Sequence, residues 1–415
     1  MRVLFVTTDH YPHSGACTNI LKKLFFDGGL LQQADEVHVL TYKYDYAEPD
    51  FEELEGVTIH RTFLWSRMSV SQLKKHAKRH PLAISKACVQ RLIQKLFPKL
   101  FRNEFPKRGT YKQLFRELLR IDAQTFDAIV PIAGDFATVQ AVWMLKKKYS
   151  HVNMVIYQVD PCATNLTALK ETLKKRQTFE DRVYAEAKAV ITTDIICKEQ
   201  ATRQPAEIIS RFVPMEFPVV FEEQKVNEEN YAFGQSVRCL FVGNIYGGIR
   251  DPRYTLRLFE KIKNIEAIRF DIVGGVDEAD FDGHFPDNVR LCGSCSLEEM
   301  GAIMGSASVL INIGNKMKNQ VPSKIFDYIA TGKPIINICK CRDCPTLKYL
   351  QDYPLCLNLF EEDALLDEQA ELLKDFILEN NAKRVKTESL KELYRECSVD
   401  YCAKIMYDAL RRKGN

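Results

Sequence analysis

The chain has 415 residues, of which 46% are hydrophobic and 27% are charged. This composition is typical of a globular protein with about two to four domains, and it excludes a disordered, collagenous or coiled-coil architecture. The net charge is only +3, but residues 61–120 contain 16 lysines and arginines against two glutamates, so one strongly basic segment interrupts an otherwise acidic chain.

The cysteine content and the hydropathy pattern favour a cytoplasmic protein. Thirteen cysteines are too sparse for a disulfide scaffold and are odd in number, which favours a reducing compartment. The apolar run Val3–Val6 is too short for a signal peptide, and the sequence has no run of 18 apolar residues that would span a bilayer.

The first half of the chain alternates short apolar strands with helical patterns. Arg2–Thr8 predicts a strand, Asp9–Gly15 a loop, and the apolar spacing from Ile20 to Leu31 a helix. Further strands are predicted at residues 36–41, 128–132, 154–158 and 189–193. This alternation predicts a doubly wound, mostly parallel α/β sheet, which binds ligands beyond the carboxyl ends of its strands.

The basic segment contains an amphipathic stretch, residues 89–105, in which Pro98 predicts a kink. An apolar stripe flanked by cations suits a membrane surface with anionic lipids. Two short helices packed on the core, with their charges in solvent, explain the pattern equally well. Nucleic acid is a third alternative, but no recognition motif accompanies the charge.

The strand pattern starts again after a break near Pro214 and Pro218. Strands are predicted at residues 237–242, 269–273, 308–313 and 335–338, and a final helix from Ser398 to Arg412. We therefore expect a domain at 1–214 with a basic insertion at about 61–120, a second domain at 215–396, and a C-terminal helix at 397–415.

One candidate binding segment of the second domain is Val321–Ile336. Pro322 suits the first turn of a helix of about nine residues that ends before Gly332. The N-terminus of this helix, with Ser323 and Lys324, is suited to a phosphate, and Asp327 can accept hydrogen bonds from both hydroxyls of a ribose. A routine helix capped by Ser323 is the alternative.

A second candidate loop follows the strand at 237–242 and runs Gly243-Asn244-Ile245-Tyr246-Gly247-Gly248-Ile249-Arg250. Its glycines let the backbone pass close to a ligand, and Arg250 precedes a helix with Asp251 as predicted N-cap and Pro252 as first residue. A guanidinium there can bind phosphate oxygens through two parallel hydrogen bonds. A glycine turn with a surface arginine does not explain why both loops lie on the same side of one sheet, so we favour a binding site.

These residues resemble a known family. The second half is similar to the nucleotide-sugar-binding domain of GT-B glycosyltransferases, especially the retaining family 4 group of bacterial surface-polysaccharide enzymes. Gly243–Arg250 resembles that group's glycine-rich loop with its diphosphate-binding arginine, and Val321–Ile336 resembles its PSK…EY.A.GKP segment. Pro12–Gly15 falls where these enzymes have a glycine loop after the first strand, facing the donor diphosphate.

The resemblance implies two Rossmann-like domains that face a central cleft, with the C-terminal helix returning to the first domain. The implied donor-binding residues are Gly15, Gly243, Asn244, Gly247, Gly248, Asn319, Pro322, Ser323 and Asp327. One departure concerns the two glutamates that the group has eight positions apart, which correspond here to Asn319 and Asp327. In the group, the first glutamate contacts the hydroxyls of the donor sugar. Asn319 has no charge for this contact, and we expect Asn315 or Lys316 to substitute for it.

The resemblance also implies a mechanism. Arg250 and Lys324 stabilise the departing nucleoside diphosphate without a required metal or cofactor. If configuration is retained, the departing phosphate deprotonates the acceptor. If it is inverted, a protein base is needed; Asp160 is the best candidate, followed by Asp135 and His10. Cys339, Cys341 and Cys344 have a metal-like spacing, but no second Cys or His cluster accompanies them, so we expect no metal site.

We therefore expect a glycosyltransferase that moves a sugar from a nucleotide diphosphate donor to a glycan acceptor. The acceptor is expected to be carried on a polyprenyl lipid, at the inner face of the plasma membrane, in bacterial capsule, exopolysaccharide or lipopolysaccharide synthesis. A nucleotide-sugar epimerase and a catalytically silent sugar-nucleotide-binding partner protein are the alternatives. The donor base and sugar, the linkage and the oligomeric state are not encoded in these motifs.

Overall fold

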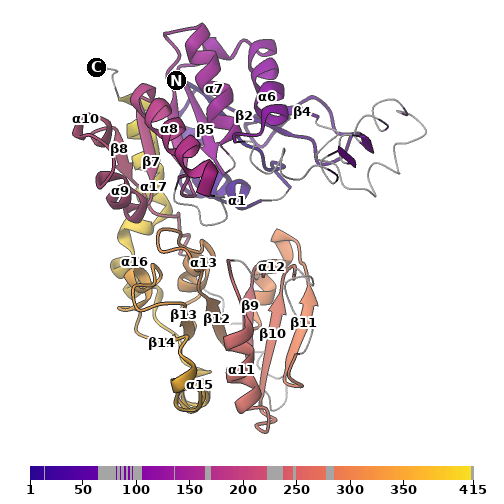
Figure 1. The fold of residues 1–415 in the computed structure, drawn as a ribbon, viewed down its shortest axis with the longest axis vertical. Coiled ribbons are helices and arrows are strands. Elements are labelled where there is room, and N and C mark those ends of the chain that lie inside the picture. The colour runs from indigo at the N-terminus through magenta and orange to yellow at the C-terminus, as the bar shows by residue number, and fades with distance from the viewer. Residues whose placement is uncertain are drawn as a thin grey trace. The chain divides into compact units, whose positions relative to one another are not determined.

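The computed structural model describes residues 1–13, 15–63, 105–134, 136–163, 170–221, 237–245, 249–276 and 285–412, with a few isolated positions between 81 and 96. The chain divides into two compact units (Figure 1). The first contains Met1–Glu216 and Asp400–Asn415, and the second contains Phe217–Val399. Most of the predicted amphipathic stretch lies outside the described residues.

The sheet of the first unit has eight strands within the described residues, in the order β3-β4-β2-β1-β5-β6-β7-β8. All neighbouring strands are parallel except β3 and β4, which are antiparallel. The strands are β1 (Arg2–Val6), β2 (Glu36–Tyr42), β3 (Phe51–Leu54), β4 (Val57–Thr62), β5 (Ala128–Ala133), β6 (Val155–Gln158), β7 (Ala189–Thr192) and β8 (Phe212–Pro214). The central strands β1, β5, β6 and β7 are almost wholly buried, which explains their continuous apolar sequences.

The helices of the first unit cover this sheet. They are α1 (Ala16–Lys22), α2 (Leu30–Gln33), α6 (Arg108–Arg120), α7 (Ala137–Lys148), α8 (Lys170–Glu186), α9 (Asp194–Ala201), α10 (Ala206–Ile209) and, from Asp400 on, α17 (Val399–Arg411). Two contacts tie α17 to the unit: Lys188 Nζ donates to the Leu410 carbonyl at 3.2 Å, and Cys402 Sγ donates to the Glu216 carbonyl at 3.4 Å.

The sheet of the second unit is wholly parallel within the described residues, in the order β11-β10-β9-β12-β13-β14. The strands are β9 (Val237–Val242), β10 (Ile268–Val273), β11 (Val289–Gly293), β12 (Val309–Ile313), β13 (Ile335–Cys339) and β14 (Cys356–Phe360). A row of amides crosses three of them, because Asn312 Nδ2 donates to Asn337 Oδ1 and Asn337 Nδ2 donates to Asn358 Oδ1, each at 2.7 Å. These bonds satisfy buried polar groups and hold the strands in register.

The helices of the second unit are α11 (Arg253–Lys261), α12 (Leu297–Gly305), α13 (Lys324–Ala330), α14 (Leu347–Leu350), α15 (Leu366–Asn380) and α16 (Thr387–Leu393). The prediction that α11 starts at Pro252 with Asp251 as N-cap is wrong by one residue. Pro252 is the N-cap, and the Asp251 carboxylate instead accepts the backbone N–H of Arg253 at 3.0 Å. The helix after Pro322 has seven residues, fewer than the predicted nine.

A stacked pair of histidines joins β2 to β4. His38 Nδ1 lies 2.9 Å from His60 Nε2, and the ring centroids are 5.2 Å apart. Burial, together with the charges of His38 and Arg120, lowers the pKa of His60 from 6.5 to about 4. A hydrogen bond between two imidazoles needs one nitrogen without a proton, so the folded state favours the neutral form.

This pair predicts a pH-dependent loss of stability in the first unit. Between pH 6.5 and about 4 the unfolded chain binds a proton at residue 60 that the folded chain does not, so the free energy of unfolding falls as the pH falls through this window. In His60→Gln this contribution disappears. Urea unfolding followed by tryptophan fluorescence reports the first unit, because both tryptophans, Trp65 and Trp143, belong to it. Parallel pH profiles of wild type and variant would contradict the prediction.

Candidate functional site

The turn after β9 is built on a close approach of two backbones. Gly243 has φ 153° and donates its N–H to the Val273 carbonyl at 2.9 Å. Gly274, with φ 147°, passes so close that a Cβ there would lie 2.0 Å from the Gly243 carbonyl oxygen. Asn244 Oδ1 then accepts the Gly275 N–H at 2.9 Å. The two glycines therefore join the loops that follow β9 and β10, and they position Asn244.

Two neutral groups help to hold Arg250 at this turn. Its Nε donates to Asn315 Oδ1 at 3.1 Å, and one terminal nitrogen donates to the Asn244 carbonyl at 3.3 Å. The guanidinium lies 5.8 Å from the centroid of the Phe241 ring. The structure thus brings together Arg250, Asn244 and the loop after β12, all at the carboxyl ends of strands. Gly247 and Gly248, predicted to belong to the same loop, lie outside the described residues.

The loop after β12 supports this arrangement and includes residues that the sequence motifs did not identify. Asn315 is buried and donates through Nδ2 to Gln320 Oε1 at 3.3 Å. The Lys316 N–H donates to the Ile249 carbonyl at 2.9 Å, which ties this loop to the residue before Arg250. Asn319, the uncharged position, is half-buried in the same loop. Asn315 therefore positions the arginine, a role that its spacing from Asn319 did not reveal.

Lys324 and Asp327 lie on consecutive turns of α13 and pair with each other. Lys324 Nζ is 3.2 Å from Asp327 Oδ2 and also contacts Met300 Sδ at 2.7 Å. Both side chains are half-buried. Ser323 occupies the N-cap position, but its side chain makes no capping hydrogen bond to the helix. The predicted phosphate cation and the predicted ribose acceptor are therefore neighbours in the structure.

Tyr328 connects α13 to the end of β9. Its hydroxyl accepts the backbone N–H of Val242 at 2.8 Å, one residue before Gly243. Burial raises the pKa of Tyr328 well above its ordinary range, the Arg250 charge lowers it and the Asp327 charge raises it. The cations Arg250 and Lys324 are thus anchored at one edge of the second sheet.

Lys333, the lysine of the GKP part of the segment, has a structural role. Its buried ammonium donates to the carbonyls of Met304 at 2.7 Å and Ala307 at 2.6 Å, and also to that of Gly305. Burial lowers its pKa to about 7. These carbonyls end α12, where a cation stabilises the helix dipole. Lys333 therefore connects α12 to β13 and does not point to a ligand.

In the first unit, Gly15 lies beside the start of α1. It has φ 118°, and a Cβ would lie 2.0 Å from Asp9 Oδ2. The Asp9 carboxylate accepts the N–H groups of Cys17 at 2.8 Å and Thr18 at 3.2 Å. Burial raises the pKa of Asp9, and these two hydrogen bonds lower it. Glycine is required here because the chain must pass the carboxylate that caps α1.

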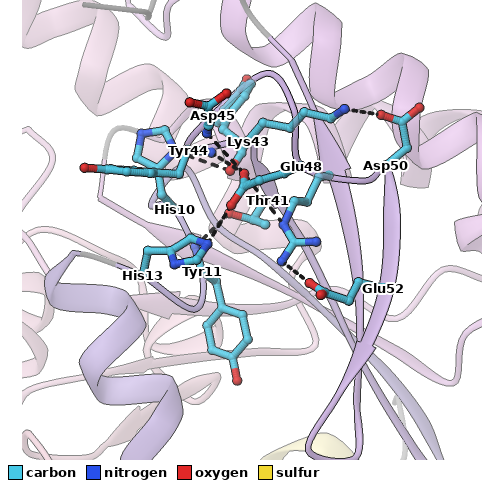
Figure 2. Close-up of polar contacts among 12 residues, drawn as sticks. His10, Tyr11, His13, Thr41, Lys43, Tyr44, Asp45, Glu48, Asp50 and Glu52 are labelled. Carbon is cyan, nitrogen blue, oxygen red and sulfur yellow. Dashed lines mark hydrogen bonds and ion pairs between the residues drawn. The ribbon is translucent and has the colours of Figure 1, made fainter. Parts of the chain in front are cut away.

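The candidate bases lie on different loops of the first unit. Asp160 follows β6, and its carbonyl accepts the side-chain amide of Gln158 at 3.1 Å. Asp135 lies outside the described residues. His10 Nδ1 lies 3.3 Å from the Tyr42 carbonyl, at the end of β2 (Figure 2).

A polar cluster around His10 was not predicted (Figure 2). His13 Nε2 lies 2.6 Å from Glu48 Oε1, while Glu48 Oε2 accepts the Tyr44 N–H at 2.6 Å. Arg61, which is buried, pairs with Glu52 at 2.6 Å. The cluster joins the loops that follow β1 and β2, and only the histidines and Pro12–Gly15 marked it in the sequence.

Two further observations concern metal ligands and membrane-spanning helices. Within the described ranges, no three His, Cys, Asp or Glu side chains come together as metal ligands. Cys339 accepts Asn337 Nδ2 at 3.2 Å, and Cys344 Sγ lies 3.1 Å from Thr346 Oγ1. In the part of the chain that the structure describes, no helix has both the length and the apolar character needed to span a bilayer.

Comparisons with known proteins define the fold. No family model matches the sequence, and no curated protein matches it. Among solved structures, an alpha,alpha-trehalose-phosphate synthase (UDP-forming) from Burkholderia xenovorans in complex with glucose-6-phosphate is similar at a TM-score of 0.63 and 11% identity, over 99% of this chain and 100% of that one. Anabaena Alr3699/HepE in complex with UDP and glucose is similar at 0.63 and 9%, over 99% of both chains. WaaG, a glycosyltransferase involved in lipopolysaccharide biosynthesis, is similar at 0.61 and 12%, over 99% of this chain and 100% of WaaG. The chain has the GT-B fold of glycosyltransferases, as its sequence predicts.

The backbone approach at Gly274 gives a test of the site. In Gly274→Ala the new methyl group cannot fit against the Gly243 carbonyl, and the positive φ adds strain, so we expect the second unit to lose about 1–3 kcal/mol of stability. Circular dichroism during thermal unfolding measures this loss.

Gly301→Ala is the matched control, because Gly301 lies inside α12 with open space around its Cβ position. There the methyl group should stabilise the helix by up to about 1 kcal/mol. Equal unfolding temperatures for the two variants would show that the close approach of the two loops does not constrain residue 274.

Proposed function

We propose that this protein is a glycosyltransferase that uses a nucleotide diphosphate sugar as its donor. The observation that carries the proposal is the placement of Arg250 and Lys324 at one edge of the second sheet, where Asn244, Asn315 and Asp327 hold them. The GT-B fold supports it, because the similar solved structures include sugar transferases and one in complex with UDP.

Arg250 and Lys324 bind the diphosphate in this proposal. Among their partners, Arg250 bonds to an amide oxygen and a carbonyl, and Lys324 pairs with the Asp327 carboxylate; a diphosphate offers both cations charge-assisted hydrogen bonds in their place. Asp327, released from Lys324, then accepts the ribose hydroxyls. The same cations stabilise the negative charge that grows on the diphosphate as the sugar–phosphate bond breaks. No step requires a metal ion, and we propose transfer with retention of configuration.

The proposed acceptor is a glycan on a polyprenyl lipid, at the inner face of the plasma membrane, in bacterial surface-polysaccharide synthesis. Two features support a membrane-bound acceptor. Residues 61–120 carry 16 cationic side chains against two glutamates. Within this segment, the described apolar residues Val89, Leu92, Ile93 and Leu96 are exposed. Exposed apolar side chains beside cations suit an anionic bilayer surface.

Calorimetric titration with UDP, GDP, dTDP and ADP tests the donor site. We expect one nucleotide to bind selectively, and we expect Arg250→Ala to weaken that binding at least tenfold, or about 1.4 kcal/mol, through loss of charge-assisted hydrogen bonds.

Arg257→Ala is the matched control, because Arg257 is an exposed arginine of α11 that pairs with Asp363. It should bind the same nucleotide as tightly as the wild type. If none of the four nucleotides binds at millimolar concentration, the donor site is wrong for this chain.

Product analysis separates the proposal from its two rivals. A glycosyltransferase consumes donor only when an acceptor is present, apart from slow hydrolysis, and releases nucleoside diphosphate. An epimerase yields a modified nucleotide sugar or free sugar without an acceptor, and a silent binding protein yields no product. Of the two rivals, the catalytically silent binding protein is the one that the uncharged Asn319 favours. We expect acceptor-dependent release of nucleoside diphosphate when lipid-linked glycans are supplied, measured by chromatography.

A further inference from the structure

The first unit contains a hollow of about 740 Å³ among α6, α7 and α8. Figure 1 shows α7 between the other two helices. The volume is within the range of small-molecule binding sites. We call it the basic pocket, because four cations line it: Arg108, Lys174, Lys175 and Arg182.

Three of the four cations in the basic pocket, Lys174, Lys175 and Arg182, have no carboxylate beside them in the lining. None of the described residues that line it is a carboxylate. Within the described part of the chain, the side-chain cations of Lys174, Lys175 and Arg182 form no ion pair. The described acids in the second half of α8 bind partners outside the pocket: Glu180 to Arg203 at 3.0 Å, Asp181 to Gln204 at 2.7 Å and Glu186 to Lys147 at 2.6 Å.

Like charges gathered without counter-charges repel one another and attract anions. The arrangement is therefore suited to a ligand that carries at least one negative charge and has several acceptor oxygens.

Aromatic rings also line the basic pocket, so part of its wall is apolar. The Arg182 guanidinium lies 4.3 Å from the Trp143 ring centroid and 5.7 Å from that of Phe179, which holds the cation against the wall. Trp143 Nε1 is buried and has no acceptor within the described residues. Gln140, on the same helix as Trp143, adds a nearly buried amide to the lining. A ligand with a charged head and an apolar or sugar portion matches these walls.

We propose that the basic pocket binds a phosphate ester. Its tetrahedral oxygens accept hydrogen bonds from several cations at once, and its charge balances theirs. The ester is either the headgroup of an anionic lipid or a soluble phosphorylated metabolite, and these two sources share the same chemistry. The proposal depends on the first unit alone, so it stands or fails independently of the nucleotide site.

The test uses the full chain and two matched probes. Vesicles of phosphatidylcholine with phosphatidic acid present the ester on a membrane, with pure phosphatidylcholine vesicles as the reference. Glycerol 3-phosphate presents the same ester in solution. We expect wild-type protein to bind at least one probe, and Lys174→Gln/Lys175→Gln to bind it at least tenfold more weakly. Vesicle flotation and calorimetry measure the two arms, and the arm that responds identifies the source.

Lys386→Gln/Lys391→Gln is the control, because it removes the same charge from two exposed lysines of the second unit. It should bind like the wild type. Both lysines of the test variant are also exposed, so the fold and nucleotide binding should be unchanged. Absence of binding to both probes overturns the proposal. So does an equal loss in the two double variants, which would show a diffuse effect of net charge.

Discussion

The close approach of Gly243 and Gly274 is the constraint on which the second unit's site depends. A carbonyl oxygen of one loop occupies the place where any other residue of the neighbouring loop would have its Cβ atom. This contact lets Asn244 bind the Gly275 N–H, and the Asn244 carbonyl in turn bonds to Arg250. The arginine is therefore oriented both by backbone packing at the carboxyl ends of β9 and β10 and by its hydrogen bond to the Asn315 side chain.

The two cationic groups of the protein differ in how their charge is balanced. In the second unit, Lys324 has Asp327 beside it and Arg250 has amide and carbonyl oxygens, so each cation has a partner that a ligand can displace. In the basic pocket, Lys174 and Lys175 have no carboxylate among the described lining residues. The first arrangement favours exchange of ligands, since free and bound states are both stabilised. The second places cations without a lining carboxylate at one hollow, an arrangement that attracts anions.

The sequence predicted the buried parallel strands and the two loops with cations, because each depends on local patterns. Continuous apolar runs identify β1, β5 and β9, and glycine spacing identifies the turn at Gly243. Five strands were not predicted. The strands β3, β11 and β14 are exposed or half-buried and carry no continuous apolar run, β4 interrupts its apolar residues with polar ones, and β8 has only three residues. Asn315, Tyr328 and the His13–Glu48 contact act through partners distant in sequence, and no spacing rule reveals such pairs.

The uncharged Asn319 is best understood together with its loop. Asn315 and Gln320 bond to each other, and the Lys316 backbone bonds to Ile249, so the loop after β12 is already joined to the arginine turn without a carboxylate. A glutamate at position 319 would add a negative charge to the loop that carries Asn315, a partner of Arg250. An amide keeps hydrogen-bonding capacity toward hydroxyl groups without adding that charge. The departure is therefore compatible with donor binding, at the expense of the stronger charge-assisted bond to the sugar.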